Sequence, residues 1–349
     1  MTATEIHTGE EGNILYAAVL ADGRLTDLYV DRRDRPDGTG AIILGRVSRL
    51  VEGLDVAFVT LDDGTEGMLP ASSVRPAEPG KRIGQILRSG QGILVQIKTS
   101  GQGDKAPVLT MDVSLPGRFL VHLPLGEGVT VSRRLKDEGV DVRPLKDMLS
   151  GLEGGWILRV SSLSVPLPQV EAEARALSVR AKGISGQTGS APRLLISAPG
   201  PAERAALDHG VQAHIVKNSN MDFSEILSAL QDKKVPLPRD GSLFIERTEA
   251  LTAIDVNGGE AGNAMAVNLE AAAEVARQIR LRNLSGIIVV DFLNMKTVAH
   301  RKKLVEKLRE AVAGDPAGCH VWGITALGLV EMTRTRRGPS LQDIAGDRL

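Results

Sequence analysis

Residues 251–263, LTAIDVNGGEAGN, join an apolar strand pattern to an acid, an amide and two glycines. Alternation with a period of two places Ile254 and Val256 on one side of a strand, and Asp255 and Asn257 on the other. The two glycines that follow allow the backbone to turn tightly or to approach a ligand closely. The stretch therefore predicts a buried strand that presents polar side chains at its C-terminal end.

A second strand with the same ending follows in LSGIIVVDFLNM, which carries Asp291 after a continuous apolar run. Between the two strands, MAVNLEAAAEVARQIRLRN has the apolar stripe of an amphipathic helix, with Glu274, Arg277 and Arg280 away from that stripe. A strand, a crossover helix and a parallel strand would bring Asp255 and Asp291 together.

Two carboxylates beside an amide oxygen form an all-oxygen site of the kind that Mg²⁺ prefers. Such a metal polarises a phosphodiester and activates water. The alternative interpretation is that Asn257-Gly258 is only a turn and that Asp291 only caps a helix.

Composition limits the class of protein. The 349 residues, 42% of them hydrophobic, are enough for more than one core, and the formal charge of −1 means that an anionic partner must be met by local patches. The single cysteine, Cys319, excludes an internal disulfide. MTATEIHTGE has no leader pattern and no apolar run has membrane length, so we expect a cytoplasmic protein without a membrane partner.

About five short strands separated by turn residues are predicted in residues 41–113. This pattern favours a small closed barrel of the OB type. Such barrels hold single-stranded nucleic acid by aromatic and basic side chains, for which the candidates are Phe58, Lys105, Arg46 and Arg49. The alternative is that Phe58 belongs to the core and that the charged residues form a solvated face.

Residues 113–190 read as mixed α/β. The segment SRRLK contains Arg133 and Arg134, and such a pair suits bidentate contact with phosphate or simply decorates a solvated loop. After a loop rich in Gly, Ser and Pro, residues 193–216 predict a strand, a helix and a strand.

Several long blocks in order resemble the ribonuclease E/G family. They are ILVQIKTSGQGDKAPVLTMDVSLPGRFLVHLP, SRR, GGWILRV, ERTEALTAIDVNGG, NLEAAAEVARQIRLRNLSGIIVVDFLNM and LGLVEMTRTRRGPSL. The resemblance implies a Mg²⁺-dependent endoribonuclease that cleaves single-stranded, A/U-rich RNA in RNA processing or decay.

The resemblance also implies a multidomain α/β architecture. An RNase H-like subdomain would comprise residues 1–38 and 191–238, and an OB-type barrel would be inserted at residues 39–112. A 5′-sensor subdomain would follow at residues 113–190, and a deoxyribonuclease-I-like catalytic subdomain at residues 239–349.

The implied site residues follow from matching positions. The two metal-binding aspartates fall on Asp255 and Asp291, with Asn257 in support. The RNA contacts of the barrel fall on Phe58 and Lys105. The arginine of the sensor that binds the RNA 5′ monophosphate falls on Arg159 in ILRV.

The sequence also departs from the family pattern. Val160 replaces a threonine whose hydroxyl would meet the phosphate, and Met68 replaces a second barrel aromatic. The loop after Asn257 is short and lacks an arginine. The sequence ends at IAGDRL, where a paired-cysteine motif would follow, so no structural zinc is expected and the sequence gives no support for a homo-oligomer. The alternative function is therefore a catalytically inactive RNA-binding or regulatory homologue.

Overall fold

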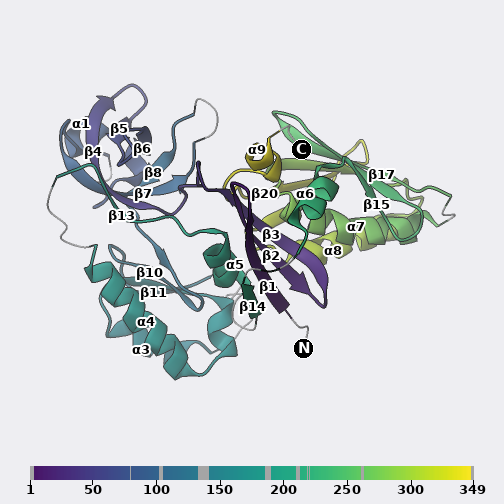
Figure 1. The fold of residues 1–349 in the computed structure, drawn as a ribbon, viewed down its shortest axis with the longest axis horizontal. Coiled ribbons are helices and arrows are strands. Elements are labelled where there is room, and N and C mark those ends of the chain that lie inside the picture. Colours follow the sequence, from purple (N-terminus) through teal and green to yellow (C-terminus); the bar gives the residue numbers. More distant parts are fainter. Residues whose placement is uncertain are drawn as a thin grey trace. The chain divides into compact units, whose positions relative to one another are not determined.

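The computed structural model describes residues 4–78, 80–101, 105–132, 141–184, 190–209, 213–217, 219, 221–260 and 263–346 (Figure 1). The chain forms two units, one of Met1–Pro36 and Ala213–Leu349 and one of Asp37–Gln212. We call them unit 1 and unit 2. Both mix helices with sheets, as predicted for an α/β protein.

Unit 2 begins with a closed barrel. In the described part of residues 37–112 five strands close through pairing of β4 with β7, in the order β4-β5-β6-β8-β7. The predicted small barrel is confirmed, and it is consistent with an OB-type fold. The strands and the neighbouring short helix are β4 (Ile42–Val51), β5 (Val56–Thr60), β6 (Glu66–Pro70), α1 (Ile83–Ile86), β7 (Gly92–Thr99) and β8 (Val108–Thr110).

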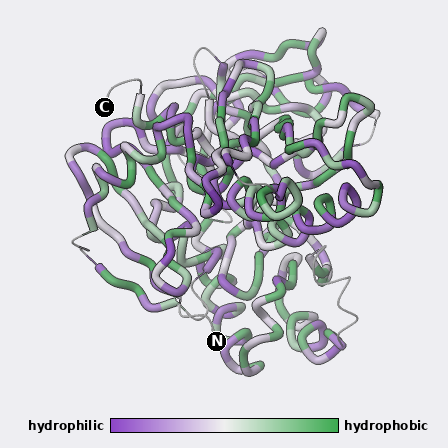
Figure 2. Tube along the Cα trace, turned by 90° about the vertical axis from the view of Figure 1, so that its right-hand side faces the viewer, coloured by the Kyte–Doolittle hydropathy of each residue, from purple (hydrophilic) through white to green (hydrophobic). Residues whose placement is uncertain are grey.

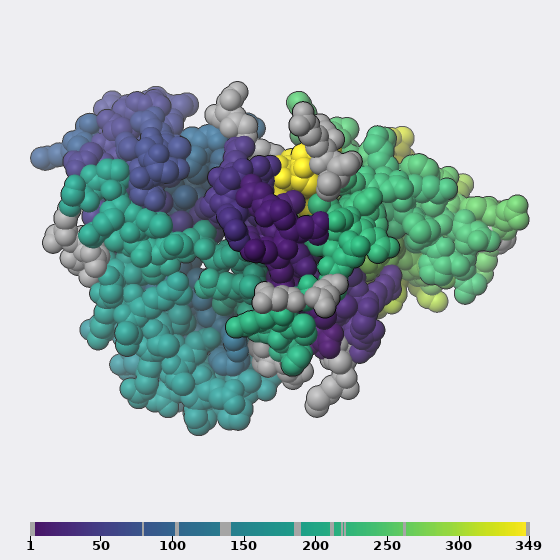
Figure 3. Space-filling view, viewed as in Figure 1, coloured from purple at the N-terminus to yellow at the C-terminus, as the bar shows by residue number. Residues whose placement is uncertain are grey.

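The rest of unit 2 is a small sheet covered by helices. Its strand order is β11-β12-β10-β9, and β13 pairs with the barrel strand β4. Figure 3 shows the blue barrel residues above the teal residues of the rest of this unit. The elements are β9 (Leu115–Pro116), β10 (Leu120–Leu123), β11 (Val129–Val131), α3 (Arg143–Ser150), β12 (Gly155–Leu158), α4 (Leu167–Lys182), β13 (Arg193–Ile196) and α5 (Pro201–His209).

Unit 1 joins the start of the chain to its last third. Its first sheet has the order β14-β1-β2-β3, in which β1 and β14 pair in parallel. Tyr16 stacks on Phe223 with ring centroids 4.2 Å apart, which anchors α6 on this sheet. The elements are β1 (Thr4–Glu11), β2 (Ile14–Ala21), β3 (Arg24–Arg32), β14 (Ala213–Lys217), α6 (Phe223–Gln231) and, near the end of the chain, α9 (Leu341–Ala345).

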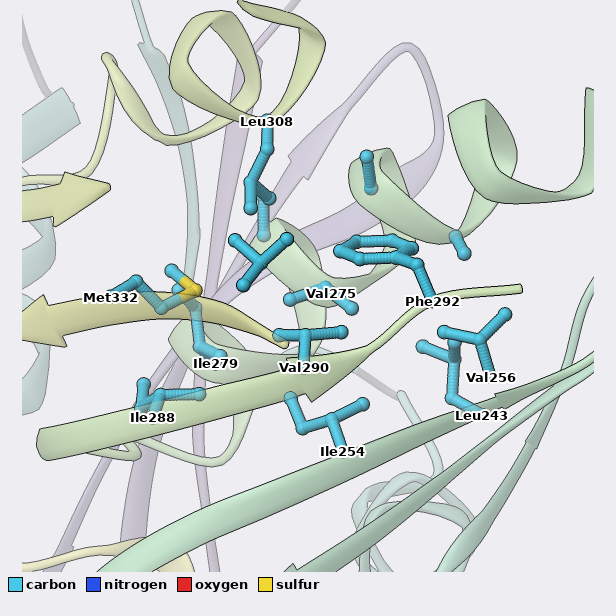
Figure 4. Close-up of a cluster of buried hydrophobic side chains, with 14 of the residues drawn as sticks. Leu243, Ile254, Val256, Val275, Ile279, Ile288, Val290, Phe292, Leu308 and Met332 are labelled. Carbon is cyan, nitrogen blue, oxygen red and sulfur yellow. The ribbon is translucent and has the colours of Figure 1, made fainter. Parts of the chain in front are cut away.

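The second sheet of unit 1 has the order β15-β16-β17-β18-β20-β19. One of its faces packs against α7 and α8, and Figure 4 shows Ile254, Val256, Ile288 and Val290 pointing into this core beside Val275 of α7. The elements are β15 (Lys234–Pro236), β16 (Ser242–Arg247), β17 (Leu251–Asn257), α7 (Ala264–Leu281), β18 (Gly286–Asp291), α8 (Val298–Val312), β19 (Cys319–Ile324) and β20 (Val330–Arg334).

Hydrophilic and hydrophobic residues alternate along the strands and helices, as the purple and green stretches of Figure 2 show. In β17, Thr252, Ile254 and Val256 are buried while Asp255 and Asn257 are exposed, so the predicted alternation is confirmed. Among the described residues, no helix combines the length and the apolar character needed to cross a bilayer.

The polar side of α7 is also covered. Glu274 is buried, at 5% exposure, and accepts hydrogen bonds from Arg24 and Arg277. Arg280 pairs with Asp27 at 3.0 Å. The polar stripe of α7 therefore faces β3 instead of water, because the first sheet of unit 1 covers it.

Candidate functional site

Asp255 and Asp291 end two neighbouring parallel strands. β17 and β18 pair with Asp255 directly opposite Asp291, so their Cα atoms are separated by about one strand spacing, roughly 4.8 Å. Both side chains are exposed. The prediction that the crossover through α7 brings these two acids together is confirmed, and the pair forms a local concentration of negative charge at one end of the sheet.

Asn257 lies on the same exposed side of β17. Its Nδ2 donates a hydrogen bond of 2.8 Å to Oδ2 of Asp255. This bond restricts the rotation of the carboxylate and leaves the other lone pairs of Asp255 available.

A tight turn fixes the end of β17. Gly259 has φ +54, and a Cβ built on it would lie 2.1 Å from the backbone oxygen of Asp240. A side chain at this position would therefore displace the loop that follows Asn257.

Asn268 was not predicted as a site residue, although it holds the segment that follows Asp291. It is fully buried in α7, donates from Nδ2 to the carbonyl of Leu293 at 2.8 Å, and accepts from the N–H of Leu293 at 3.0 Å. This amide pair ties the loop after β18 to α7. The available signal was a polar residue among the apolar positions of the helix, because a buried amide requires specific partners.

The donor set suits a hard divalent cation. Asp255 and Asp291 offer oxygen ligands, and Asn257 orients one of them. Within the described ranges no group of three or more His, Cys, Asp or Glu residues is arranged to hold a metal. Two carboxylates without nitrogen or sulfur ligands fit Mg²⁺, which keeps several waters, better than they fit structural zinc.

The candidate RNA contacts of the barrel lie close together. Phe58 is half-buried and pairs across the strands with Met68, whose N–H donates to the carbonyl of Pro107 at 2.8 Å. The exposed Lys105 lies two residues before Pro107. The guanidinium of Arg49 lies 3.7 Å from the ring centroid of Phe58, a cation–π contact.

Arg46 and Arg49, the other two basic candidates of the barrel, have different partners. Arg46 donates to the carbonyls of Ala191 and Gly90, so it serves the packing of unit 2. Arg49 pairs with Glu66, and a hydrogen bond from Ser48 lowers the pKa of that carboxyl. Glu66 therefore stays ionised beside Arg49.

Arg159 has internal partners in unit 2. Its Nη1 donates to the carbonyl of Gly117 at 2.7 Å, and its Nη2 lies 3.5 Å from Oδ1 of Asp208. Asp208 is almost completely buried, with a side-chain exposure of 3%. Arg133 and Arg134 lie outside the described residues.

The structure thus combines a closed barrel with a pair of exposed carboxylates on a separate sheet. Comparison with known proteins gives the family. The sequence model of the ribonuclease E/G family matches residues 114–232 and 210–337. The chain belongs to the ribonuclease E/G family, and the prediction that it is an enzyme of the endoribonuclease class is confirmed at that level.

Individual relatives cover most of the chain. Ribonuclease G of Escherichia coli strain K12 is 30% identical over 94% of this chain and 78% of its own length. Ribonuclease E of the same strain is 33% identical over 92% of this chain and 36% of its own length. Ribonuclease E of Nostoc sp. is 30% identical over 95% of this chain and 56% of its own length.

Proposed function

We propose that the chain is a Mg²⁺-dependent endoribonuclease that cleaves single-stranded, A/U-rich RNA in RNA processing or decay. The observation that carries the proposal is the parallel register of Asp255 and Asp291, with Asn257 donating to Asp255. The pair is exposed and so is open to a long polymer. Family membership supports RNA as the substrate.

Each residue of the site has a distinct role in this proposal. Asp255 and Asp291 would hold Mg²⁺ from two strands, and Asn257 would keep the Asp255 carboxylate turned toward it. When bound, Mg²⁺ activates water and stabilises the charge that develops on the phosphate oxygens. Asn268 is a positioning residue, because it fixes the backbone that follows Asp291.

RNA would be gripped in unit 2 as well. We assign this role to Phe58 and Lys105 of the barrel, to Arg159, and to Arg133 and Arg134. The contact of Arg49 with the half-buried Phe58 supports the barrel assignment, because it keeps a cation beside an aromatic ring.

We also propose a subdomain order by analogy with the family. Residues 1–38 and 191–238 would form an RNase H-like part, residues 39–112 an OB-type barrel, residues 113–190 a sensor for the RNA 5′ end, and residues 239–349 a deoxyribonuclease-I-like catalytic part. The parallel pairing of β1 with β14 supports the joining of residues 1–38 and residues 191–238 in one subdomain.

The test of the proposed function is cleavage of a 5′-labelled, A/U-rich single-stranded RNA with Mg²⁺ or with EDTA. Asp255→Asn and Asp291→Asn should each lower the cleavage rate at least about 100-fold, because electrostatic stabilisation is lost. Asn257→Ala should raise the Mg²⁺ concentration for half-maximal rate by about 10-fold, since orienting partners are typically worth that much.

Glu249→Gln is the matched control for these variants. Glu249 is an exposed carboxylate in the turn before β17, at the opposite end of that strand from Asp255. Its cleavage rate and the thermal midpoints of all four variants should equal those of the parent chain. Equal cleavage by Asp291→Asn and the parent would refute the site.

The second candidate function is an RNA-binding homologue without turnover. It is favoured by the internal partners of Arg159 and by Val160 and Met68 at positions where the family has polar or aromatic groups. It predicts RNA binding that weakens steeply with salt and no product at any Mg²⁺ concentration.

A further inference from the structure

The second sheet of unit 1 has one face that turns away from α7 and α8. Across the strands, Phe244 lies opposite Asp255, which lies opposite Asp291. In the next row, Val289 lies opposite Glu331. We call this surface the open face, and its exposed or half-buried members are Lys234, Pro236, Phe244, Glu246, Leu251, Ala253, Asp255, Asn257, Ile287, Val289, Asp291, His320, Trp322, Glu331 and Thr333.

Trp322 presents an ordered aromatic surface to solvent. Its side chain is 63% exposed at an irregularity of β19, between Val321 and Gly323. Its Nε1 donates to Oγ1 of Thr333 at 3.1 Å, and its ring meets the ring of His320 edge-on with centroids 4.4 Å apart. The indole is therefore held in place before any ligand arrives, which lowers the entropic cost of stacking on it.

Phe244 is the second aromatic side chain of the open face. It is 39% exposed and lies on β16, directly across from Asp255. The ammonium group of the exposed Lys234 lies 6.0 Å from its ring centroid. An aromatic ring with a solvent-exposed cation beside it matches a nucleobase and its phosphate.

The two rings flank the carboxylate pair. Phe244 is one strand from Asp255 on the β16 side. Trp322 lies two strands from Asp291 on the β19 side, next to Gly323, which pairs with Glu331. Strand spacing and rise place Trp322 about 12 Å from Asp291, a distance that a few nucleotides span.

We propose that Phe244 and Trp322 are base-stacking subsites, one on each side of Asp255 and Asp291, on a path that single-stranded RNA takes across the open face. The proposal rests on the proposed function for the position of the scissile phosphate. The occupant is RNA and not a protein, because the two rings flank a carboxylate pair that suits a divalent cation and the exposed Lys234 lies beside Phe244.

The experiment uses a short 2′-O-methyl A/U oligonucleotide, which binds without being cut. The chain has two tryptophans, and Trp156 is 1% exposed, so a ligand that stacks on Trp322 changes the exposed part of the emission. We expect RNA to quench the emission of the parent chain, and we expect no quenching in Trp322→Phe.

The oligonucleotide affinity and the cleavage kinetics of variants test the two stacking subsites in a second way. Trp322→Leu and Phe244→Leu should each weaken oligonucleotide binding by roughly 5- to 150-fold, the range measured for loss of one stacked base. On cleavable RNA they should raise KM with little change in kcat. Trp322→Phe should retain most of the affinity, because it keeps an aromatic face. The matched control is Val179→Ala, an exposed apolar residue of α4 in unit 2.

Saturable RNA binding without a change in emission, together with unchanged affinity in Trp322→Leu, would overturn the proposal. Loss of self-association in Trp322→Leu with intact RNA affinity would also overturn it, in favour of a contact between copies. Quenching without cleavage would uphold the stacking subsites and contradict only the proposed catalysis.

Discussion

The side chains around Arg159 limit its ability to bind a phosphate. Its guanidinium already donates to Gly117 and faces the buried carboxylate of Asp208. The next residue, Val160, has no hydroxyl to donate. A phosphate arriving at Arg159 would have to compete with Asp208 for the same charge, and such competition would weaken the proposed recognition of the RNA 5′ end.

We therefore expect 5′-monophosphorylated and 5′-hydroxylated RNAs of the same sequence to be cleaved at rates within about twofold of one another, since no new charge-assisted bond is gained at low cost. Single-turnover cleavage of the two RNAs measures this ratio. Val160→Thr supplies the absent hydroxyl and should increase the preference for monophosphate. A preference of tenfold or more in the parent chain would show that Arg159 is free to bind phosphate.

At the scale of elements, the sequence was enough to predict the strands and the barrel that depend on local residue patterns. The period of two in β17 and the apolar run of β18 were enough to place Asp255 and Asp291 side by side, because a crossover helix leaves few arrangements open. The barrel was predicted from turn residues and strand lengths. These features require information from neighbouring residues only.

Features that depend on distant parts of the chain were missed. Glu274 and Arg280 of α7 were placed away from the apolar stripe, but their partners, Arg24 and Asp27, lie near the start of the chain and were not predicted. Asn268 and Trp322 were overlooked for a related reason. Whether a polar residue in a helix or an aromatic residue in an edge strand is buried depends on which elements cover it, and periodicity does not contain that information.

The loop after β17 gives a prediction at this scale. Gly259→Ala should lower stability by roughly 1–3 kcal/mol, because the left-handed backbone and the contact with Asp240 both oppose a side chain. Cleavage should fall with it, since Asn257 is displaced. Gly314→Ala is the control, because Gly314 has open space around it. Chemical denaturation measures both, and equal midpoints for the two variants would contradict this account.

At the scale of the whole molecule, each unit contains one tryptophan. Trp156 is buried in unit 2 and stacks on His122 with ring centroids 4.1 Å apart, whereas Trp322 is exposed in unit 1. The unfolding of the two units is therefore observable separately. This matters because a chain with several cores often departs from two-state unfolding.

Unit 2 should be the acid-sensitive part. His122 is 3% exposed, and burial lowers its pKa below the usual value of about 6.5. The unfolded chain then binds the proton more readily, so stability is full above about pH 6.5 and declines as the pH falls toward the folded pKa.

Denaturant titrations of Trp322→Phe, in which Trp156 alone emits, should show a lower midpoint at pH 5.5 than at pH 7.5. Adding His122→Phe, which keeps a ring against Trp156, should reduce this difference. An equal pH effect with and without His122 would assign the acid sensitivity to other groups.

The pairing of β1 with β14 has a consequence for synthesis on the ribosome. β14 begins at Ala213, about 200 residues after β1 ends at Glu11. At translation rates of about 5–20 residues per second, β1 waits roughly 10 to 40 s for its partner, with one edge unpaired. Glu5, Glu10 and Glu11 place like charges along that strand. Mutual repulsion between these carboxylates would keep nascent chains on one polysome from pairing with each other while the rest of the sheet is still being made.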